Sequence, residues 1–287
     1  MTLRVSANGM DIAYESLGSP GDRPLLLIMG LGSQLIQWDD AFCALLVEQG
    51  HHVIRFDNRD VGLSTHLDDL GVPDLGAVVR DPAKAPYLLA DMAADAAGLL
   101  TAIGWPAAHV VGASMGGMVA QQFAVDFPQM VLSLTSIMST PGSRIGPPTP
   151  EASAALGAPP ARDREAAIAQ ALETWRVIGS PGYEFDEDYL RDSAGRAYDR
   201  DHHPQGAARQ LAAILASPDR SERLRGLTMP ALVIHGESDP LVGLAGGQAT
   251  AAAIPGAKLM TFPGMGHDLP RPLWKQIIGE ISELTAS

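Results

Sequence analysis

The chain has 287 residues, of which 46% are hydrophobic and 18% charged, and its formal net charge is −13. This length suits one large α/β domain with an insertion or two small domains, and the acidity argues against nucleic acid or an anionic membrane as a partner. A single cysteine, Cys43, excludes an internal disulfide, and we interpret it as a buried structural thiol. Without a signal-peptide pattern in residues 1–5 or an apolar run of roughly 20 residues, we expect a cytoplasmic protein.

Strand and helix patterns alternate in the first half of the chain. Residues 3–16 predict a hairpin that turns at Asn8-Gly9. The continuous apolar run at 24–29 predicts a strand buried on both faces. The next expected elements are a helix at 38–48, a strand at 52–56, a helix at 87–103, a strand at 108–111, a helix ending near Pro128 and a strand at 131–137. Repeated strand–helix units predict an α/β fold with a mostly parallel sheet.

The pattern changes after Ser139. Residues 141–160 are rich in Pro, Gly and Ser, and no strand pattern interrupts the helical patterns at 163–178, 186–199 and 204–216. Strand patterns then resume at 231–235 and 257–262, followed by a last helix at 272–284. We therefore predict a core of residues 1–140 and 226–287, with residues 141–225 inserted as a helical cap.

The residues Gly112-Ala113-Ser114-Met115-Gly116 form a G-x-S-x-G motif between an apolar strand pattern and a helical segment. In this context the motif predicts a nucleophile elbow, a tight strand-to-helix turn that exposes the serine. Glycine permits the close backbone contacts of such a turn, and the helix N-terminus favours negative charge there. Ser114 is therefore the candidate nucleophile.

A nucleophilic serine needs a general base and an acid that orients the base. In this kind of fold both follow late strands, with the acid first. Asp239 follows the strand at 231–235 and His267 follows the strand at 257–262, so we predict them as the acid and the base. Glu237 is an alternative acid, although the Asp-Pro turn at Asp239 favours the latter. Asp268 is expected to point away from the site.

The tetrahedral intermediate of acyl transfer carries an oxyanion that needs backbone N–H donors. We predict one donor at Met115, directly after the nucleophile. The second is expected in the loop after the strand at 24–29, where we assign the Leu31 N–H, with Gly30 and Gly32 as alternatives.

Together these motifs resemble the α/β-hydrolase superfamily over nearly the whole chain. Residues 57–64 resemble the D-x-R-G-x-G-x-S loop of many members, but Asp60 stands where glycine is usual. Met29 replaces the histidine of the common His-Gly pair, which looks like the aclacinomycin methylesterase branch. The resemblance implies an α/β-hydrolase fold with an eight-stranded sheet flanked by helices, serine carboxylester hydrolysis without a cofactor, and a helical cap over the pocket.

The expected pocket lies between core and cap, and its apolar character favours small to medium apolar esters as substrates. Besides Leu31 and Met115, the predicted substrate-binding residues are Gly30, Gly32, Trp175, Ile178, Leu211, Ile214 and Met265. The same apolar side chains equally suit packing of the cap against the core, so this alternative stays open.

The remaining histidines suggest no further chemistry. His109 and His235 lie in strand patterns and are expected to be packed. The pair His202-His203 lacks a carboxylate or thiolate at a spacing typical of metal sites, so we predict no metal.

Other functions use the same residues. A thioesterase, lactonase, C–C bond hydrolase or perhydrolase would need the same serine, histidine and aspartate, whereas haloalkane dehalogenases and epoxide hydrolases have an aspartate nucleophile. A non-catalytic ligand-binding protein is the alternative of a different class, because fold alone does not establish activity. We expect a small-molecule ester as the partner and a monomer or homodimer.

Overall fold

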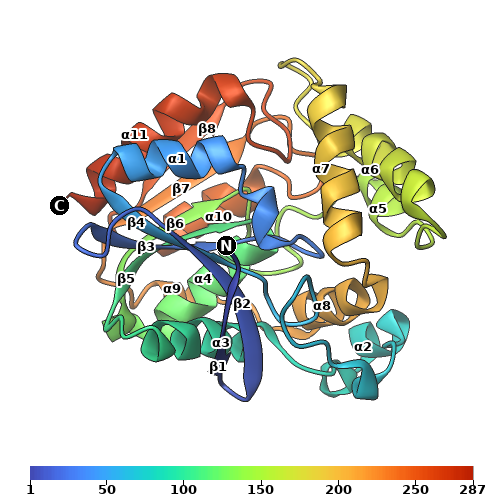
Figure 1. Ribbon diagram of the computed structural model, residues 1–287, viewed down its shortest axis with the longest axis horizontal. Helices are drawn as coiled ribbons and strands as arrows, with labels where there is room; N and C mark the ends of the chain where they lie inside the picture. Colours follow the sequence, from blue (N-terminus) through green and yellow to red (C-terminus); the bar gives the residue numbers. More distant parts are fainter. Residues whose placement is uncertain (287) are drawn as a thin grey trace.

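The structure of the protein is a computed structural model that describes residues 1–286. Within these residues, eight strands form one sheet in the order β1-β2-β4-β3-β5-β6-β7-β8 (Figure 1). The strands are β1 (Leu3–Ala7), β2 (Met10–Leu17), β3 (Arg23–Ile28), β4 (His51–Phe56), β5 (Ala108–Ala113), β6 (Val131–Ile137), β7 (Ala231–Gly236) and β8 (Lys258–Phe262). β2 runs antiparallel to β1 and β4, and the other pairings are parallel.

The β1–β2 end of the sheet follows from local sequence. Asn8 and Gly9 both have positive φ angles, 51° and 76°, so the two-residue turn twists with the strands that it joins. The predicted hairpin is therefore confirmed. In the centre, β3 and β5 pair in parallel with Ile28 opposite Gly112. This register places the loop after β3 beside the turn after β5.

Helices cover both faces of the sheet (Figure 1). Apolar residues of α3 and α4 pack in one buried cluster, and those of α1 and α11 pack in a second cluster with the other sheet residues. The helices of this part are α1 (Asp40–Glu48), α2 (Leu75–Arg80), α3 (Leu89–Ala102), α4 (Met115–Asp126), α10 (Ala245–Ala253) and α11 (Trp274–Thr285). Single 3-10 turns lie at Leu35–Gln37, Asp68–Leu70, Pro82–Lys84, Pro128–Met130 and Arg271–Leu273.

The helices between β6 and β7 are α5 (Pro150–Leu156), α6 (Arg164–Ile178), α7 (Glu187–Arg200), α8 (Pro204–Ala216) and α9 (Ser221–Leu224). α5, α6 and α7 pack on one another beside the sheet, and α8 packs against α2 (Figure 1). They occupy the segment to which we assign the cap, and the division of the chain at residues 141 and 225 stays a prediction. No helix of the described residues is both long and apolar enough to cross a bilayer.

Four helices, α2, α5, α9 and α10, were not expected from the sequence. α5 lies inside the Pro- and Gly-rich segment, where Thr149 accepts a hydrogen bond from the Ala152 N–H and Pro150 occupies the first turn. α2 has six residues, too few for an apolar period to show. α10 consists mostly of Ala and Gly. Its Gly247 lies where a Cβ would come within 2.5 Å of the His235 ring, so packing selects glycine there against helix propensity.

Candidate active site

The turn between β5 and α4 holds Ser114 in a strained conformation. Its φ and ψ angles are 56° and −123°, and α4 begins at the next residue. A Cβ on Gly112 would lie 2.1 Å from the Gly116 carbonyl oxygen, and one on Gly116 would lie 2.0 Å from the Ile28 carbonyl oxygen. Neither contact is possible, so both positions require glycine. The turn is the predicted elbow, and Ser114 is only partly buried.

Ser114, His267 and Asp239 lie in one hydrogen-bonded chain. The His267 Nε2 is 2.8 Å from the Ser114 Oγ, and its Nδ1 is 2.7 Å from the Asp239 Oδ2. His267 and Asp239 are buried, with exposed fractions of 5% and 6%. This arrangement suits transfer of the serine proton to the imidazole, because the carboxylate orients the ring and stabilises its positive charge.

The Asp239 carboxylate is fixed by its own turn. Its Oδ1 accepts hydrogen bonds from the Leu241 and Val242 N–H groups, each at 2.9 Å, which leaves Oδ2 for His267. The alternative acid, Glu237, accepts a hydrogen bond from the Thr261 hydroxyl at 2.8 Å on the exposed surface. Asp268 accepts a hydrogen bond from Ser180, and burial raises the pKa of this carboxyl. The geometry therefore favours Asp239 as the partner of His267.

The loop after β3 lies against the elbow. A Cβ on Gly30 would lie 3.1 Å from the Ser114 Cβ and 3.6 Å from its Oγ. Within residues 1–286, the Leu31 and Met115 N–H groups donate to no other protein atom. The Gly32 N–H, in contrast, donates to the Gln210 Oε1 of α8 at 2.8 Å. Because the Gly32 N–H already donates to α8, the Leu31 and Met115 N–H groups are the better donors for an oxyanion.

Comparison with known proteins gives the family. The model of the alpha/beta hydrolase fold family matches residues 23–270. The chain belongs to this family. It is 32% identical to rhodomycin D methylesterase of Streptomyces peucetius, over 94% of this chain and 93% of that protein. It is 31% identical to the pimeloyl-[acyl-carrier protein] methyl ester esterase of Chromobacterium violaceum, over 70% and 76% of the two chains.

Solved structures agree on the fold. The enol-lactonase from Burkholderia xenovorans superimposes with a TM-score of 0.78 at 21% identity, over 99% of this chain and 100% of that structure. An esterase from Rhodococcus superimposes with a TM-score of 0.75 at 21% identity, over 99% and 98%. At this level of identity the comparison shows that the chain has the α/β-hydrolase fold expected from its motifs.

In this hydrolase the end of α6 and the residues after it contact the loop that carries His267, the candidate general base. The His267 N–H donates to the Ile178 carbonyl at 2.7 Å, at the end of α6. The Ser180 Oγ accepts a hydrogen bond from the Gly266 N–H at 2.8 Å and donates to the Asp268 carboxylate. Sequence reasoning missed Ser180, because 86 residues separate it from Gly266 and no motif marks it.

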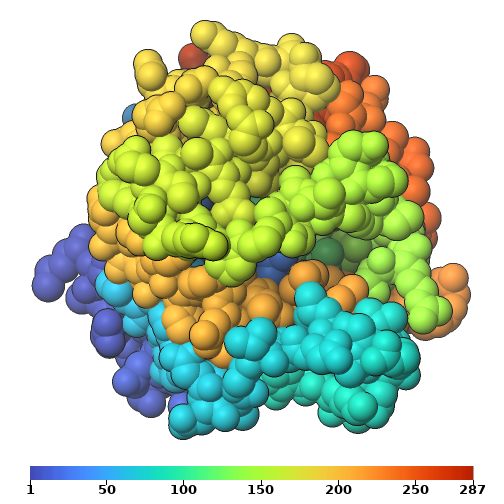
Figure 2. Space-filling model, turned by 90° about the vertical axis from the view of Figure 1, so that its right-hand side faces the viewer, coloured from blue at the N-terminus to red at the C-terminus, as the bar shows by residue number. Residues whose placement is uncertain are grey.

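The predicted pocket residues have different surroundings. Trp175 borders a cavity of about 500 Å³ whose wall also includes Tyr183, Phe185, Ser238 and Pro240. Figure 2 shows the surface hollowed between the α5–α6 region and α8, with blue atoms of the N-terminal part of the chain at the floor.

The other predicted lining residues contribute mainly to packing or to backbone contacts. Ile178 is buried and meets His267 through its carbonyl group. Leu31 and Ile214 are half-buried and pack against the core, and Leu211 is half-buried on α8. Met265 is fully buried in the cluster of α1 and α11, so the structure places this side chain in the core and not in a pocket.

Asp60 explains the departure of this chain from the usual glycine. Its φ angle is 69°, a left-handed conformation that glycine adopts most readily. Its carboxylate accepts hydrogen bonds from Arg209 of α8 at 2.9 and 2.7 Å and from the Tyr87 hydroxyl at 2.8 Å. Arg200 of α7 forms a second ion pair with Asp57 at 2.7 Å. The loop at 57–64 therefore forms ion pairs with α7 and α8 of the predicted cap.

The two strand histidines are packed as expected. His235 is fully buried, and its Nε2 donates to the Val242 carbonyl at 2.7 Å. His109 is 8% exposed and shares a hydrogen bond with the Ser133 hydroxyl at 2.8 Å. Burial lowers the pKa of both side chains, which favours the neutral form in the folded protein.

Proposed function

We propose that this protein hydrolyses carboxylic esters, in particular methyl esters of larger acids, through an acyl-enzyme on Ser114. The observation that carries the proposal is the hydrogen-bonded chain from Ser114 through His267 to Asp239. The similarity to rhodomycin D methylesterase and to the pimeloyl methyl ester esterase supports an ester substrate with a small alcohol.

In the first half-reaction the Ser114 Oγ attacks the ester carbonyl carbon while the His267 Nε2 accepts the hydroxyl proton. The carbonyl oxygen becomes an oxyanion, and the Leu31 and Met115 N–H groups stabilise it. The proton on His267 then passes to the leaving alkoxide, so the alcohol departs and the acyl group remains on Ser114.

The second half-reaction reverses these roles. His267 accepts a proton from water, and the resulting hydroxide attacks the acyl carbon at the same oxyanion site. Collapse of the intermediate breaks the bond to the Ser114 Oγ, which regains the proton from His267, and the carboxylic acid leaves. Asp239 keeps the ring orientation and the Nδ1 proton in place throughout, because its Oδ2 accepts from Nδ1.

Removal of the nucleophile tests the reaction. We expect Ser114→Ala to lower kcat on methyl esters by several orders of magnitude without loss of folding, since the histidine then has no nucleophile to activate. A fluorophosphonate should label the wild-type protein at Ser114 and should not label the variant. Ser153→Ala, which changes an exposed serine of α5, is the matched control and should behave as wild type. Full activity of Ser114→Ala would refute the assignment.

The same assay tests the alcohol preference when methyl and butyl esters of one acid are compared. We expect the wild-type protein to have the higher kcat/KM on the methyl ester. A preference for the butyl ester, with Ser114 still essential, would remove the methyl ester part of the proposal and leave ester hydrolysis intact.

A further inference from the structure

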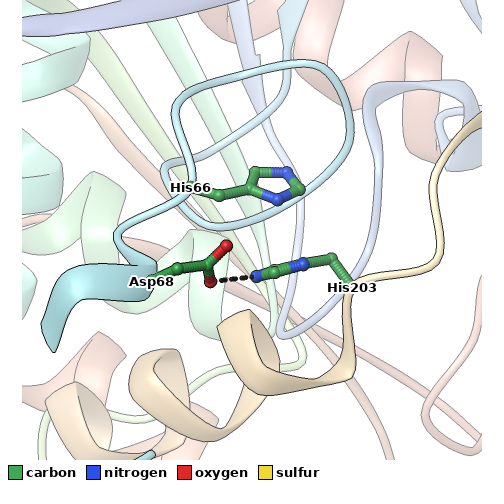
Figure 3. Close-up of side chains that lie close together, drawn as sticks. All are labelled: His66, Asp68 and His203. Carbon is green, nitrogen blue, oxygen red and sulfur yellow. Dashed lines mark ion pairs between the residues drawn. The ribbon is translucent and has the colours of Figure 1, made fainter. Parts of the chain in front are cut away.

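Three side chains with metal-ligand chemistry meet at the junction of core and cap. His66 and Asp68 follow the loop after β4, and His203 lies in the link between α7 and α8. One ligand atom from each lies within 4.8 Å of the others. Figure 3 shows the His66 ring above the His203 ring, with the Asp68 carboxylate beside both. The distance from the His203 Nε2 to the Asp68 Oδ1 is 2.9 Å.

The outer side of the His66 ring is already held in the way that metal-bound imidazoles are held. Its Nε2 donates to the Gly62 carbonyl at 3.0 Å and lies 3.5 Å from the Asp201 Oδ2. That Asp201 oxygen is buried and has no hydrogen-bond partner among the described residues. A proton on Nε2 leaves the Nδ1 with a lone pair, and Figure 3 shows this nitrogen on the side of His203. A carbonyl or carboxylate on the far nitrogen orients a ligating histidine and raises its basicity.

The excess of negative charge around the three side chains also favours binding of a cation. Two guanidinium groups at this junction face four carboxylates, which are those of Asp57, Asp60, Asp68 and Asp201. Arg200 pairs with Asp57, and Arg209 pairs with Asp60, so each of these pairs is neutral. Asp68 and Asp201 retain a joint charge of about −2, which a divalent cation would balance.

Arg209 is the competing cation. Its Nη2 lies 3.0 Å from the Asp68 Oδ1 and 3.2 Å from the His203 Nε2. The same side chain keeps two bonds to Asp60 and one to the Gly71 carbonyl at 3.0 Å. A metal on His203 and Asp68 would therefore compete with these two contacts of the Arg209 Nη2, while the buried ion pair of Arg209 with Asp60 stays in place.

We propose that the His66 Nδ1, the His203 Nε2 and the Asp68 carboxylate bind a divalent transition metal of the Zn²⁺ type, with water completing the coordination. Two imidazoles and one carboxylate suit Zn²⁺ better than Mg²⁺ or Ca²⁺, which prefer oxygen ligands. The ligand side chains are 18% to 57% exposed, so a metal can enter from solvent. The metal ties the core loop to the α7–α8 link and so holds the cap. The sequence predicted no metal, because 135 residues separate Asp68 from His203.

Zinc titration of the purified, chelator-treated protein tests the site. Calorimetry with ZnCl₂ should show one bound Zn²⁺ per chain. His66→Ala and His203→Ala should each raise the Kd by roughly 10- to 100-fold or more, since loss of even a supporting contact has effects of this size. The matched control is His202→Ala. The His202 ring is exposed and stacks on Tyr198 at 4.5 Å outside the cluster, so this variant should bind Zn²⁺ as wild type does.

Thermal unfolding provides the second measurement. Zn²⁺ should raise the Tm of wild type and of His202→Ala, because a ligand that binds the folded state stabilises it. The rise should vanish in His66→Ala. If His203→Ala does not fold, His66→Ala and the exposed-site variant Asp68→Asn decide the question. The proposal would be overturned if wild type did not bind Zn²⁺ stoichiometrically. It would also be overturned if the His66→Ala and Asp68→Asn variants bound Zn²⁺ with the same Kd as wild type. None of these readouts depends on ester turnover.

Discussion

Individual side chains show how local strain and burial serve the site. Ser114 has a positive φ angle, which costs a non-glycine residue on the order of 1–3 kcal/mol. The glycines at 112 and 116 make the strained turn possible, because they let β3, β5 and α4 approach one another closely. This part of the site was predictable from sequence, since the motif itself records the backbone requirement.

Buried His109 gives a pH prediction. Burial lowers the pKa of His109 to about 4, whereas the unfolded side chain titrates near 6.5. Between these values the unfolded chain binds a proton that the folded chain does not, so stability falls as the pH drops from about 6.5 towards 4. We expect His109→Gln to lose less stability than wild type between pH 7 and pH 5 in urea denaturation. In the exposed-site variant His202→Gln, the free energy of unfolding should change with pH as it does in wild type. The same pH dependence in all three proteins would contradict the prediction.

At the level of elements, the site depends on the ends of β7 and β8 and on the end of α6. The first two were predictable, because loops at the carboxyl ends of parallel strands carry sites in α/β sheets. The contact of α6 with the His267 loop was not, since it depends on how the cap packs. The Ser180 hydroxyl joins the Gly266 N–H to the Asp268 carboxylate and so acts on His267 through its neighbours.

Loss of this hydroxyl should misplace the base. We expect Ser180→Ala to lower kcat by roughly 10- to 100-fold with little change in KM, because small displacements of a catalytic group reduce the rate strongly while the pocket stays intact. The rate of fluorophosphonate labelling should fall in parallel, and Ser180→Thr should restore part of both. An unchanged kcat in a folded Ser180→Ala protein would show that the His267 loop does not need the cap.

Helix prediction succeeded where local sequence sets the helix and failed where tertiary packing does. α6, α7 and α8 were expected within one or two residues of their bounds, because their apolar and charged residues alternate at the helical period. α2, α5, α9 and α10 were missed. They are short or composed mostly of small residues, and tertiary packing forms them where local preference is weak.

Across the whole molecule, buried ion pairs join the cap to the core. The Arg209 and Asp60 side chains are both fully buried, whereas the Arg164–Asp199 pair within the cap is exposed. Arg209→Met should lower the free energy of unfolding by about 3–5 kcal/mol, because it leaves the Asp60 carboxylate buried without its partner. Arg164→Met is the matched control and should change stability little, since water screens an exposed pair. Urea denaturation measures the free energy of unfolding of both variants. Similar decreases in the two variants would argue against the Arg209–Asp60 pair as the main ion pair between cap and core.

The sequence by itself determined the α/β class, the elbow at Ser114 and the chain order of Ser114, Asp239 and His267. These depend on hydrophobic period and turn chemistry, which act over a few residues. Only the tertiary structure decided that Asp239 and not Glu237 meets His267, that Met265 belongs to the core and that Ser180 supports the histidine loop. It also brought His66 and Asp68 to His203. Such contacts join residues far apart in the chain, and their distances are set by the packing of cap on core.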